Sequence, residues 1–126
     1  MARVLVVEDD EDIRGLIVAK VESGKHAVMS AGSADEALAL VSQRGAPEIA
    51  VLDVGLPGMN GLELLQALRL QAGQPDLPAV FLSARVSAED VQAGRDLGAT
   101  YLTKPFVASA LLAAIKAAVP DPIRGW

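Results

Sequence analysis

Short runs of apolar residues alternate with longer stretches that carry apolar residues at helical spacing, five times along the chain. The short runs lack the polar alternation of a half-exposed strand, and this is typical of strands that helices cover on both faces. The pattern therefore predicts a βα repeat with a parallel sheet between two helix layers. The expected strands are Arg3–Val7, His26–Ala31, Glu48–Asp53, Pro78–Ser83 and Ala99–Leu102.

Residues that favour helix ends mark the limits of the expected helices. Gly24 ends the first helix in the way a C-terminal glycine does. Ser33 and Glu36 form a capping-box pattern before the second helix, and Asn60 and Glu63 have the same spacing before the third. The apolar faces of the first three helices are expected to consist of Ile13, Leu16, Ile17 and Val21, then Ala37, Leu38 and Val41, then Leu62, Leu65 and Leu68. The fourth helix is expected to be a short polar one, Ser87–Leu97, with Ser87 and Asp90 at capping spacing. The last helix is expected over Val107–Val119.

The length of 126 residues fits a single domain. We assign residues 1–119 to it and residues 120–126 to a tail, because Pro120 and Pro122 cannot continue the last helix. The tail could be a cloning remnant, a packed terminus or the first residues of a linker.

Composition and charge argue against several classes of function. The chain has no cysteine, so disulfides and thiolate metal sites are excluded. No apolar run approaches the roughly 20 residues of a membrane span, and Met1 leads directly into a strand-like run, so we expect a cytoplasmic protein with no membrane partner. The net charge of −5, the pI of about 4.7 and the 3% aromatic content argue against direct binding of nucleic acid.

Polar side chains stand where the predicted strands end. Glu8 and Asp9 follow the first strand, Asp53 ends the third, Ser83 ends the fourth and Lys104 follows the fifth. Right-handed crossovers bring the carboxyl ends of parallel strands to one edge of the sheet, where open α/β sheets bind their ligands. We therefore expect these five side chains to converge.

Glu8, Asp9 and Asp53 would form a cluster of three carboxylates, which repel one another unless a cation or protons join them. Because the available ligands are oxygen atoms, the cluster favours Mg²⁺ or Mn²⁺ over Zn²⁺. Glu11 and Asp12 are interpreted instead as acids at a solvated helix start, with Asp10 or Asp12 as the cap.

Lys104 and Ser83 each allow a structural and a chemical interpretation. Lys104 could simply neutralise a carboxylate, or it could bind a phosphoryl oxygen from a position fixed by Pro105. The Ser83 hydroxyl could cap a turn, or it could act as a donor beside the small Ala84. Together with Asp53 as nucleophile, the set fits in-line phosphoryl transfer to a carboxylate.

Four motifs in this order give the chain a close resemblance to the receiver domain of bacterial two-component response regulators, over Arg3–Val119. The resemblance implies a flavodoxin-like fold, with a five-stranded parallel sheet of order 2-1-3-4-5, two helices on one face and three on the other. The motifs are Val-Leu-Val-Val-Glu-Asp-Asp at Val4–Asp10, Leu-Asp-Val-Gly-Leu-Pro-Gly-Met-Asn-Gly at Leu52–Gly61, Leu-Ser-Ala at Leu82–Ala84 and Gly-Ala-Thr-Tyr-Leu-Thr-Lys-Pro-Phe at Gly98–Phe106.

The resemblance also implies roles for single residues at the carboxylate cluster. Asp53 would accept a phosphoryl group from a histidine kinase or a phosphotransfer protein. Asp9 would bind Mg²⁺ directly and Glu8 largely through water, and the Gly55 carbonyl would complete the protein ligands. The chain would then be a phosphoacceptor and no enzyme beyond self-catalysed phosphotransfer and autodephosphorylation.

A second set of implied roles concerns the response to phosphorylation. Lys104 and Ser83 would hold phosphoryl oxygens, and the Lys104-Pro105 bond would be cis. Ser83 and Tyr101 would form a switch pair, in which the ring turns in behind the hydroxyl and remodels the face made by the fourth helix, fifth strand and fifth helix. The downstream partner would be an unidentified output protein or domain, and a phosphorylation-dependent homodimer is one form the response could take.

Some positions depart from the family pattern or vary within the family. Gly55 and Arg85 occupy positions that tune dephosphorylation, so the sequence leaves the phosphoryl lifetime open. The alanine-rich last helix argues against the charge-paired dimer face of DNA-binding members. An aspartyl-phosphate phosphatase is disfavoured because Gly55 stands where that class needs a second acid. The alternative that we keep is a phosphorylation-independent interaction module on the same fold.

Overall fold

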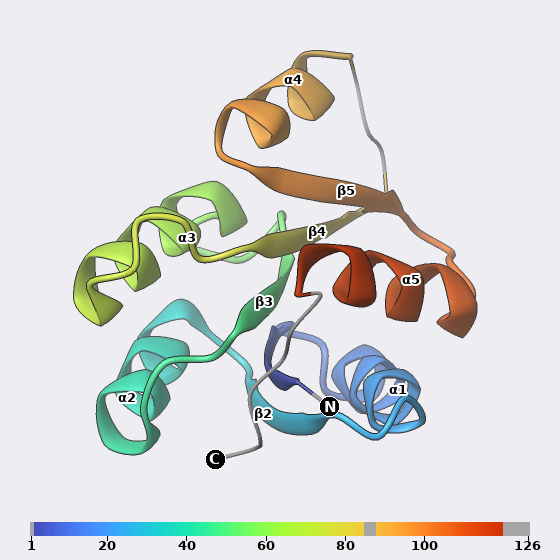
Figure 1. The fold of residues 1–126 in the computed structure, drawn as a ribbon, viewed down its shortest axis with the longest axis horizontal. Coiled ribbons are helices and arrows are strands. Elements are labelled where there is room, and N and C mark those ends of the chain that lie inside the picture. Colours follow the sequence, from blue (N-terminus) through green and yellow to red (C-terminus); the bar gives the residue numbers. More distant parts are fainter. Residues whose placement is uncertain (1, 85–87, 120–126) are drawn as a thin grey trace.

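Five parallel strands form the centre of the computed structural model, which describes residues 2–84 and 88–119 (Figure 1). The strand order is β2-β1-β3-β4-β5, and α1 and α5 cover one face while α2, α3 and α4 lie on the other. Both features are those that the resemblance implied. The elements are β1 (Arg3–Val7), α1 (Glu11–Glu22), β2 (Ala27–Ala31), α2 (Ala34–Arg44), β3 (Ile49–Asp53), α3 (Gly61–Ala72), β4 (Ala79–Ser83), α4 (Ala88–Asp96), β5 (Ala99–Thr103) and α5 (Ala108–Ala118).

The predicted strands agree with the observed ones to within one residue at each end. The last helix is one residue shorter at each end than expected, and α4 ends at Asp96, one residue before Leu97. The expected Ser87–Asp90 cap, Arg85 and the tail at 120–126 lie outside the described residues. Within those residues, none of the helices has the length and apolar character that crossing a membrane requires.

Alternate residues of each strand pack into two separate cores. Leu5 and Val7 of β1 lie in the core beneath α2 and α3, whereas Val4 and Val6 lie in the core beneath α1 and α5. Successive side chains of a strand point to opposite faces of the sheet, so the first residue after a strand is expected to point to the same face as the residue two positions before it. Glu8 therefore continues the face of α1 and α5.

The first helix begins at one of the two expected caps, Asp10 or Asp12, but it does not end in the way expected of Gly24. The Asp10 side chain accepts a hydrogen bond from the Ile13 amide at 3.0 Å, which selects Asp10 as the cap. At the other end, the residue with positive φ is Lys25, at 64°, and Gly24 is not. Gly24 instead lies close to α5, because a Cβ atom there would be 2.5 Å from the end of the Leu112 side chain, which would then have to move.

The two expected capping boxes turn out to differ. Asn60 and Glu63 make both bonds of the box at the start of α3. Ser33 accepts from the Glu36 amide at 3.1 Å, but the Glu36 carboxylate accepts from the amide of Gly32 and not from that of Ser33. The Ser33–Glu36 pattern thus predicted the start of α2 and the bond to Ser33 correctly, but the bond to the Glu36 carboxylate comes from a different amide.

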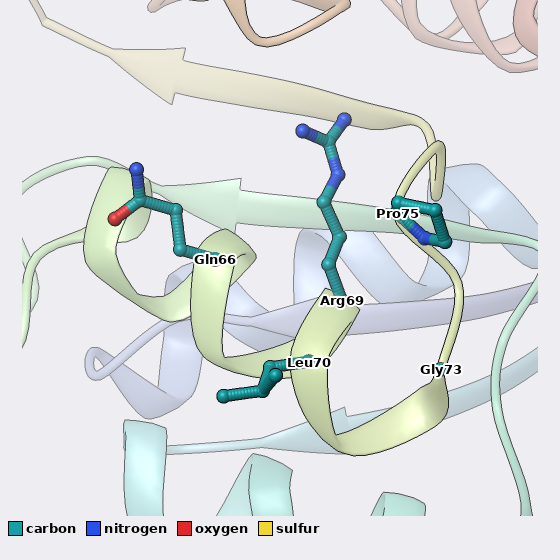
Figure 2. Close-up of a pocket in the computed structure, with 5 residues that line it drawn as sticks. All are labelled: Gln66, Arg69, Leu70, Gly73 and Pro75. Carbon is teal, nitrogen blue, oxygen red and sulfur yellow. The ribbon is translucent and has the colours of Figure 1, made fainter.

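The guanidinium of Arg69 joins three elements at the amino edge of the sheet. Its Nε and Nη2 atoms donate to the Leu77 carbonyl at 3.0 and 2.8 Å, and Nη2 also donates to the Leu97 carbonyl beyond α4. Figure 2 shows the side chain rising from α3 beside Pro75, whereas Leu70 projects elsewhere. An open pocket of about 420 Å³ lies beside it, at the opposite end of α3 from the loop that follows Asp53.

Candidate functional site

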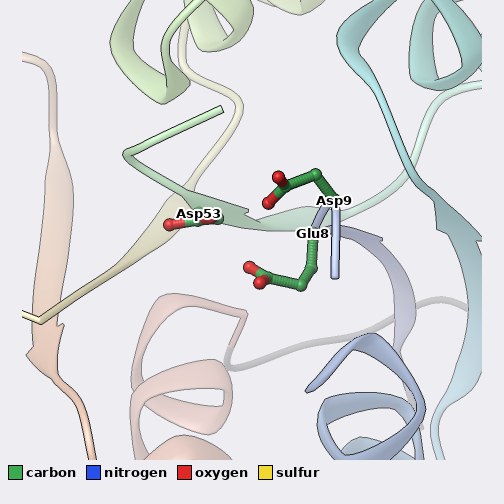
Figure 3. Close-up of side chains that lie close together, drawn as sticks. All are labelled: Glu8, Asp9 and Asp53. Atoms are coloured by element: carbon green, nitrogen blue, oxygen red, sulfur yellow. The ribbon is translucent and has the colours of Figure 1, made fainter. Parts of the chain in front are cut away.

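Three carboxylates meet at the carboxyl edge of the sheet, where β1 and β3 end (Figure 3). One oxygen atom from each of Glu8, Asp9 and Asp53 lies within 4.8 Å of the others. Glu8 is 2% exposed and Asp53 9% exposed, whereas Asp9 is open to solvent. The cluster therefore has a buried floor and an accessible rim, and the sequence predicted its three members.

Backbone contacts fix the two buried acids. The Glu8 amide donates to the Ala31 carbonyl of β2 at 3.1 Å, which holds the chain as it leaves β1. The Asp53 Oδ1 atom accepts from the Gly55 amide at 3.1 Å. Gly61 lies so close behind that a Cβ atom there would be 2.8 Å from the Asp53 carbonyl oxygen. The start of α3 thus packs directly on the backbone of Asp53.

Lys104 reaches the cluster from the loop after β5. Its Nζ atom lies 3.5 Å from Glu8 Oε2 and 3.7 Å from Asp53 Oδ1, so it contacts both buried acids. The Lys104 amide donates to the Ser83 carbonyl at 2.7 Å, and the Lys104-Pro105 bond is cis as expected. On the far side of that bond, the Lys20 ammonium of α1 donates to the Phe106 carbonyl at 3.1 Å. The loop is therefore anchored on both sides of Lys104.

The electrostatics of the cluster fit an additional cation. The pKa of Glu8 is raised to about 7, chiefly by burial and then by the hydrogen bond and charge of Asp53 and the charge of Asp9, while the charge of Lys104 opposes the rise. A buried carboxyl that resists ionisation beside two other acids marks a place where positive charge is favourable. The donors are carboxylate oxygens, which Mg²⁺ and Mn²⁺ prefer. The residues present therefore fit a hard divalent cation.

Ser83 and Tyr101 lie on the other face of the sheet. Phe81 and Tyr101 both pack with the core beneath α2 and α3, and Ser83 stands two residues after Phe81. In the parallel register Phe81 pairs with Tyr101 and Ser83 with Thr103. Ser83 at the end of β4 thus approaches the edge that holds Glu8, Asp53 and Lys104 from the opposite face, and Tyr101 lies on the face of Ser83 but further back along the sheet.

Arg14 is a site residue that sequence reasoning missed. Its Nη1 atom donates to the Glu8 carbonyl at 2.9 Å, and its guanidinium rests on Gly32, where a Cβ atom would lie 2.8 Å from Nη1. It therefore ties α1 to the turn that carries Glu8 and Asp9. An arginine on an exposed helix gives no signal of this role, because the contact depends on how α1 and the loop after β2 are placed.

Comparison with known proteins gives the family. A family model described as the response regulator receiver domain matches residues 4–116. The chain belongs to this family. Its members are phosphoacceptors that interact with histidine kinases. The motifs quoted from the sequence lie within the matched residues, so the resemblance is confirmed.

Relatives and solved structures agree with this assignment. The phosphate regulon transcriptional regulatory protein PhoB of Klebsiella pneumoniae is 37% identical over 116 residues, which cover 91% of this chain and 50% of PhoB. The transcriptional regulatory protein PrrA of Mycobacterium tuberculosis is 39% identical over 91% of this chain and 48% of PrrA. The chemotaxis protein CheY4 of Vibrio cholerae has a structure with a TM-score of 0.83 and 32% identity, covering 94% of this chain and 98% of CheY4.

The chain spans about half the length of the curated relatives that it matches. Those relatives are named as transcriptional regulators, so the comparisons give no support to the expectation that nucleic acid is not bound. That expectation rests on the net charge of −5, the low pI and the 3% aromatic content.

Proposed function

We propose that the chain is a phosphorylation-dependent switch in which Asp53 accepts a phosphoryl group from a histidine kinase or a phosphotransfer protein. The observation that carries the proposal is the contact of the Lys104 ammonium with both Glu8 and Asp53, beside the exposed Asp9. A purely structural ion pair would not require a third acid, Asp9, beside the two that Lys104 contacts at the open edge of the sheet. A cytoplasmic location is part of the proposal.

The transfer itself is an exchange of one bond to phosphorus for another. An oxygen of the Asp53 carboxylate forms the new bond, while the bond between phosphorus and the donor nitrogen breaks and its electron pair stays on that nitrogen. The exposed rim formed by Asp9 leaves Asp53 approachable from solvent. Lys104 and the Ser83 hydroxyl would hold the phosphoryl oxygens.

The divalent cation would be held by Glu8, Asp9, Asp53 and the Gly55 carbonyl. When bound, it supplies charge neutralisation for the incoming phosphoryl oxygens. Glu8 is buried and its pKa is raised to about 7, so a bound cation would favour its charged form. Arg14 holds the turn that carries Glu8 and Asp9 through the Glu8 carbonyl.

The response would be a shift between two arrangements of the face formed by α4, β5 and α5. Ser83 would move toward the phosphoryl group and the Tyr101 ring would occupy the space behind it. The output protein or domain, or a second copy of the chain, would bind the remodelled face.

One experiment tests the phosphoacceptor role. The protein is incubated with Mg²⁺ and a small acyl phosphate, and its intact mass is followed, with Asp53→Asn as the matched variant. We expect the wild-type chain to gain one phosphoryl group and Asp53→Asn to gain none. Removal of Mg²⁺ by a chelator should abolish the gain.

A second arm uses beryllofluoride, which mimics the bound phosphoryl group, and follows backbone amide resonances. We expect changes around Ser83 and Tyr101 in the wild-type chain and none in Asp53→Asn. A wild-type chain that gains no mass and shows no resonance change would leave the phosphorylation-independent interaction module as the better description.

A further inference from the structure

The ring of Tyr101 packs directly against a glycine of α4. Gly94 is buried on the side of the helix that faces β5. A methyl group at position 94 would lie 2.7 Å from the ring atom Cδ2, and closer still to Cε2. Carbon atoms in proteins essentially never approach so closely, so no other amino acid fits at position 94 while the ring stays where it is.

The other side of the ring is closed by β4. The rings of Tyr101 and Phe81 have centroids 5.1 Å apart and planes tilted by 41°, a favourable aromatic arrangement. Phe81 is fully buried and stands opposite Tyr101 in the register of β4 and β5. The ring thus lies between the buried Phe81 ring and the backbone of α4, so an added side chain at position 94 would have to displace the ring or the helix.

A glycine inside a helix is unfavourable relative to alanine, because the unfolded chain has more freedom to lose. Gly61 is the first residue of α3, and the two glycines in the interiors of described helices, Gly15 and Gly94, differ in what an added side chain would meet. At Gly15 of α1 an added Cβ would meet nothing within 4 Å, whereas at Gly94 it would meet the Tyr101 ring. The loss of helix stability that glycine causes at position 94 is therefore offset by the packing of the Tyr101 ring in the space that its missing side chain leaves.

We infer that Gly94 is a positioning residue for the switch, because its missing side chain forms the notch that accepts the Tyr101 ring. The inference rests on the proposed function, in which the ring turns inward when Asp53 is phosphorylated. The ring lies against Gly94 in this structure, and the notch keeps that packed arrangement sterically available. Any side chain at position 94 displaces the ring toward solvent or lifts α4 from β5, and the phosphorylated site then loses its connection to this face.

A double-mutant cycle tests the packing without any phosphorylation. The variants are Gly94→Ala, Tyr101→Ala, the two combined, and Gly15→Ala as the matched helical control. Gly15→Ala should raise the denaturation midpoint, as helix propensity requires. Gly94→Ala should lower it in the wild-type background and raise it when Tyr101 has been replaced, because the clash is then gone.

A spectroscopic measurement reports the position of the ring itself. Tyr101 is the single tyrosine of the chain, so incorporation of fluorotyrosine gives one fluorine resonance. Gly94→Ala should shift this resonance toward the position of free fluorotyrosine and make it insensitive to beryllofluoride. The same variant should still take up the phosphoryl group from a small acyl phosphate, since Gly94 lies outside the carboxylate cluster.

The outcomes separate this inference from the proposed function. If the wild-type chain takes up no phosphoryl group, the proposed function fails, while the double-mutant cycle still tests the notch. If Gly94→Ala alone does not fold but the combined variant does, the notch is supported. The inference is overturned if Gly94→Ala raises the midpoint as Gly15→Ala does, if the resonance does not move, or if the combined variant is no more stable than Tyr101→Ala.

Discussion

Glu8 is the residue whose environment departs furthest from what its side chain prefers. It is 2% exposed, it faces two other acids, and its pKa is raised to about 7, first by burial and then by Asp53. In the unfolded chain the same group titrates near 4.5. Between these two values the folded protein holds a proton that the unfolded protein has released.

The free energy of unfolding of the metal-free protein should therefore fall as the pH rises from about 4.5 to 7. The contribution of Glu8 is fully present below its unfolded pKa and is lost once the pH has risen through its folded pKa. The slope from this one group is at most about 1.4 kcal/mol per pH unit. Denaturation in the presence of a chelator should be compared for the wild-type chain and Glu8→Gln, whose curve lacks this slope.

His26 has to be separated from this effect, because its slope has the opposite sign. Burial and the positive amino terminus lower the pKa of His26, with Glu48 opposing, and its Nδ1 atom accepts from the Ala2 amide at 2.9 Å. Its contribution is present above its unfolded pKa of 6.5 and is lost as the pH falls through its lower folded pKa. The wild-type chain and Glu8→Gln both keep His26, so the difference between their curves of unfolding free energy against pH isolates the effect of Glu8. Parallel curves would contradict the argument that buried Glu8 holds a proton in the folded protein.

The sequence predicted those residues of the carboxylate cluster that are both reactive in type and placed at the end of a strand. Glu8 and Asp53 directly follow apolar runs, and Lys104 comes just after the fifth strand. A parallel sheet brings such positions together whatever the details of packing. Arg14 and Gly94 could not be found in this way. Each acts through a contact with a distant segment, Arg14 over Gly32 and Gly94 under Tyr101, and these contacts depend on the tilt of a helix and not on a local pattern.

At the scale of elements, Arg69 links α3, the start of β4 and the turn between α4 and β5. The Leu77 and Leu97 carbonyls both accept from its guanidinium, and Leu77 is 1% exposed. A lysine carries the same charge but cannot present the planar fork of donors that these bonds use. Arg69→Lys should therefore lower the free energy of unfolding by about 1–3 kcal/mol, the cost of leaving buried carbonyls unsatisfied.

Arg95→Lys provides the matched control for this substitution. Arg95 is exposed on α4, and exposed substitutions of this kind change stability by less than about 0.5 kcal/mol. Both variants should be compared by chemical denaturation at one pH. Equal effects of the two substitutions would show that Arg69 acts only as a surface charge.

Helix and strand limits were predicted to within a residue or two, because apolar spacing and capping residues act locally. The end of α1 shows where this fails. Gly24 looks like a residue chosen for positive φ, yet Lys25 takes that conformation and Gly24 provides space for Leu112. A glycine in a sequence does not reveal whether it serves the backbone or a neighbouring side chain.

Across the whole molecule, α4 is packed more lightly on the sheet than the other four helices. The helices α1, α2, α3 and α5 each bury aliphatic side chains against the sheet. In α4, the one buried residue among those whose burial is described is Gly94, which has no side chain. Figure 1 shows α4 beside β5 at the edge of the sheet, away from the central strands. Elements with few buried apolar contacts open at low free-energy cost, and conformational switches draw on such elements.

Amide hydrogen exchange should therefore respond to beryllofluoride unevenly. With Mg²⁺ present, we expect the exchange rates of β4, α4 and β5 to change, while those of β1, β2 and α2 stay as they were. Lys104→Ala is the decisive variant, because Lys104 contacts Glu8 and Asp53 and its amide bonds to the Ser83 carbonyl.

Replacement of the Lys104 side chain keeps that backbone bond and the three carboxylates, so Mg²⁺ binding should survive. The exchange response of α4 and β5, however, should be lost, because no ammonium then draws the phosphoryl mimic toward the end of β5. Titration of Mg²⁺ by amide resonances checks the first expectation and hydrogen exchange the second. A Lys104→Ala chain whose α4 still responds as the wild-type chain does would place the coupling elsewhere, in Ser83 and the backbone of β4 alone.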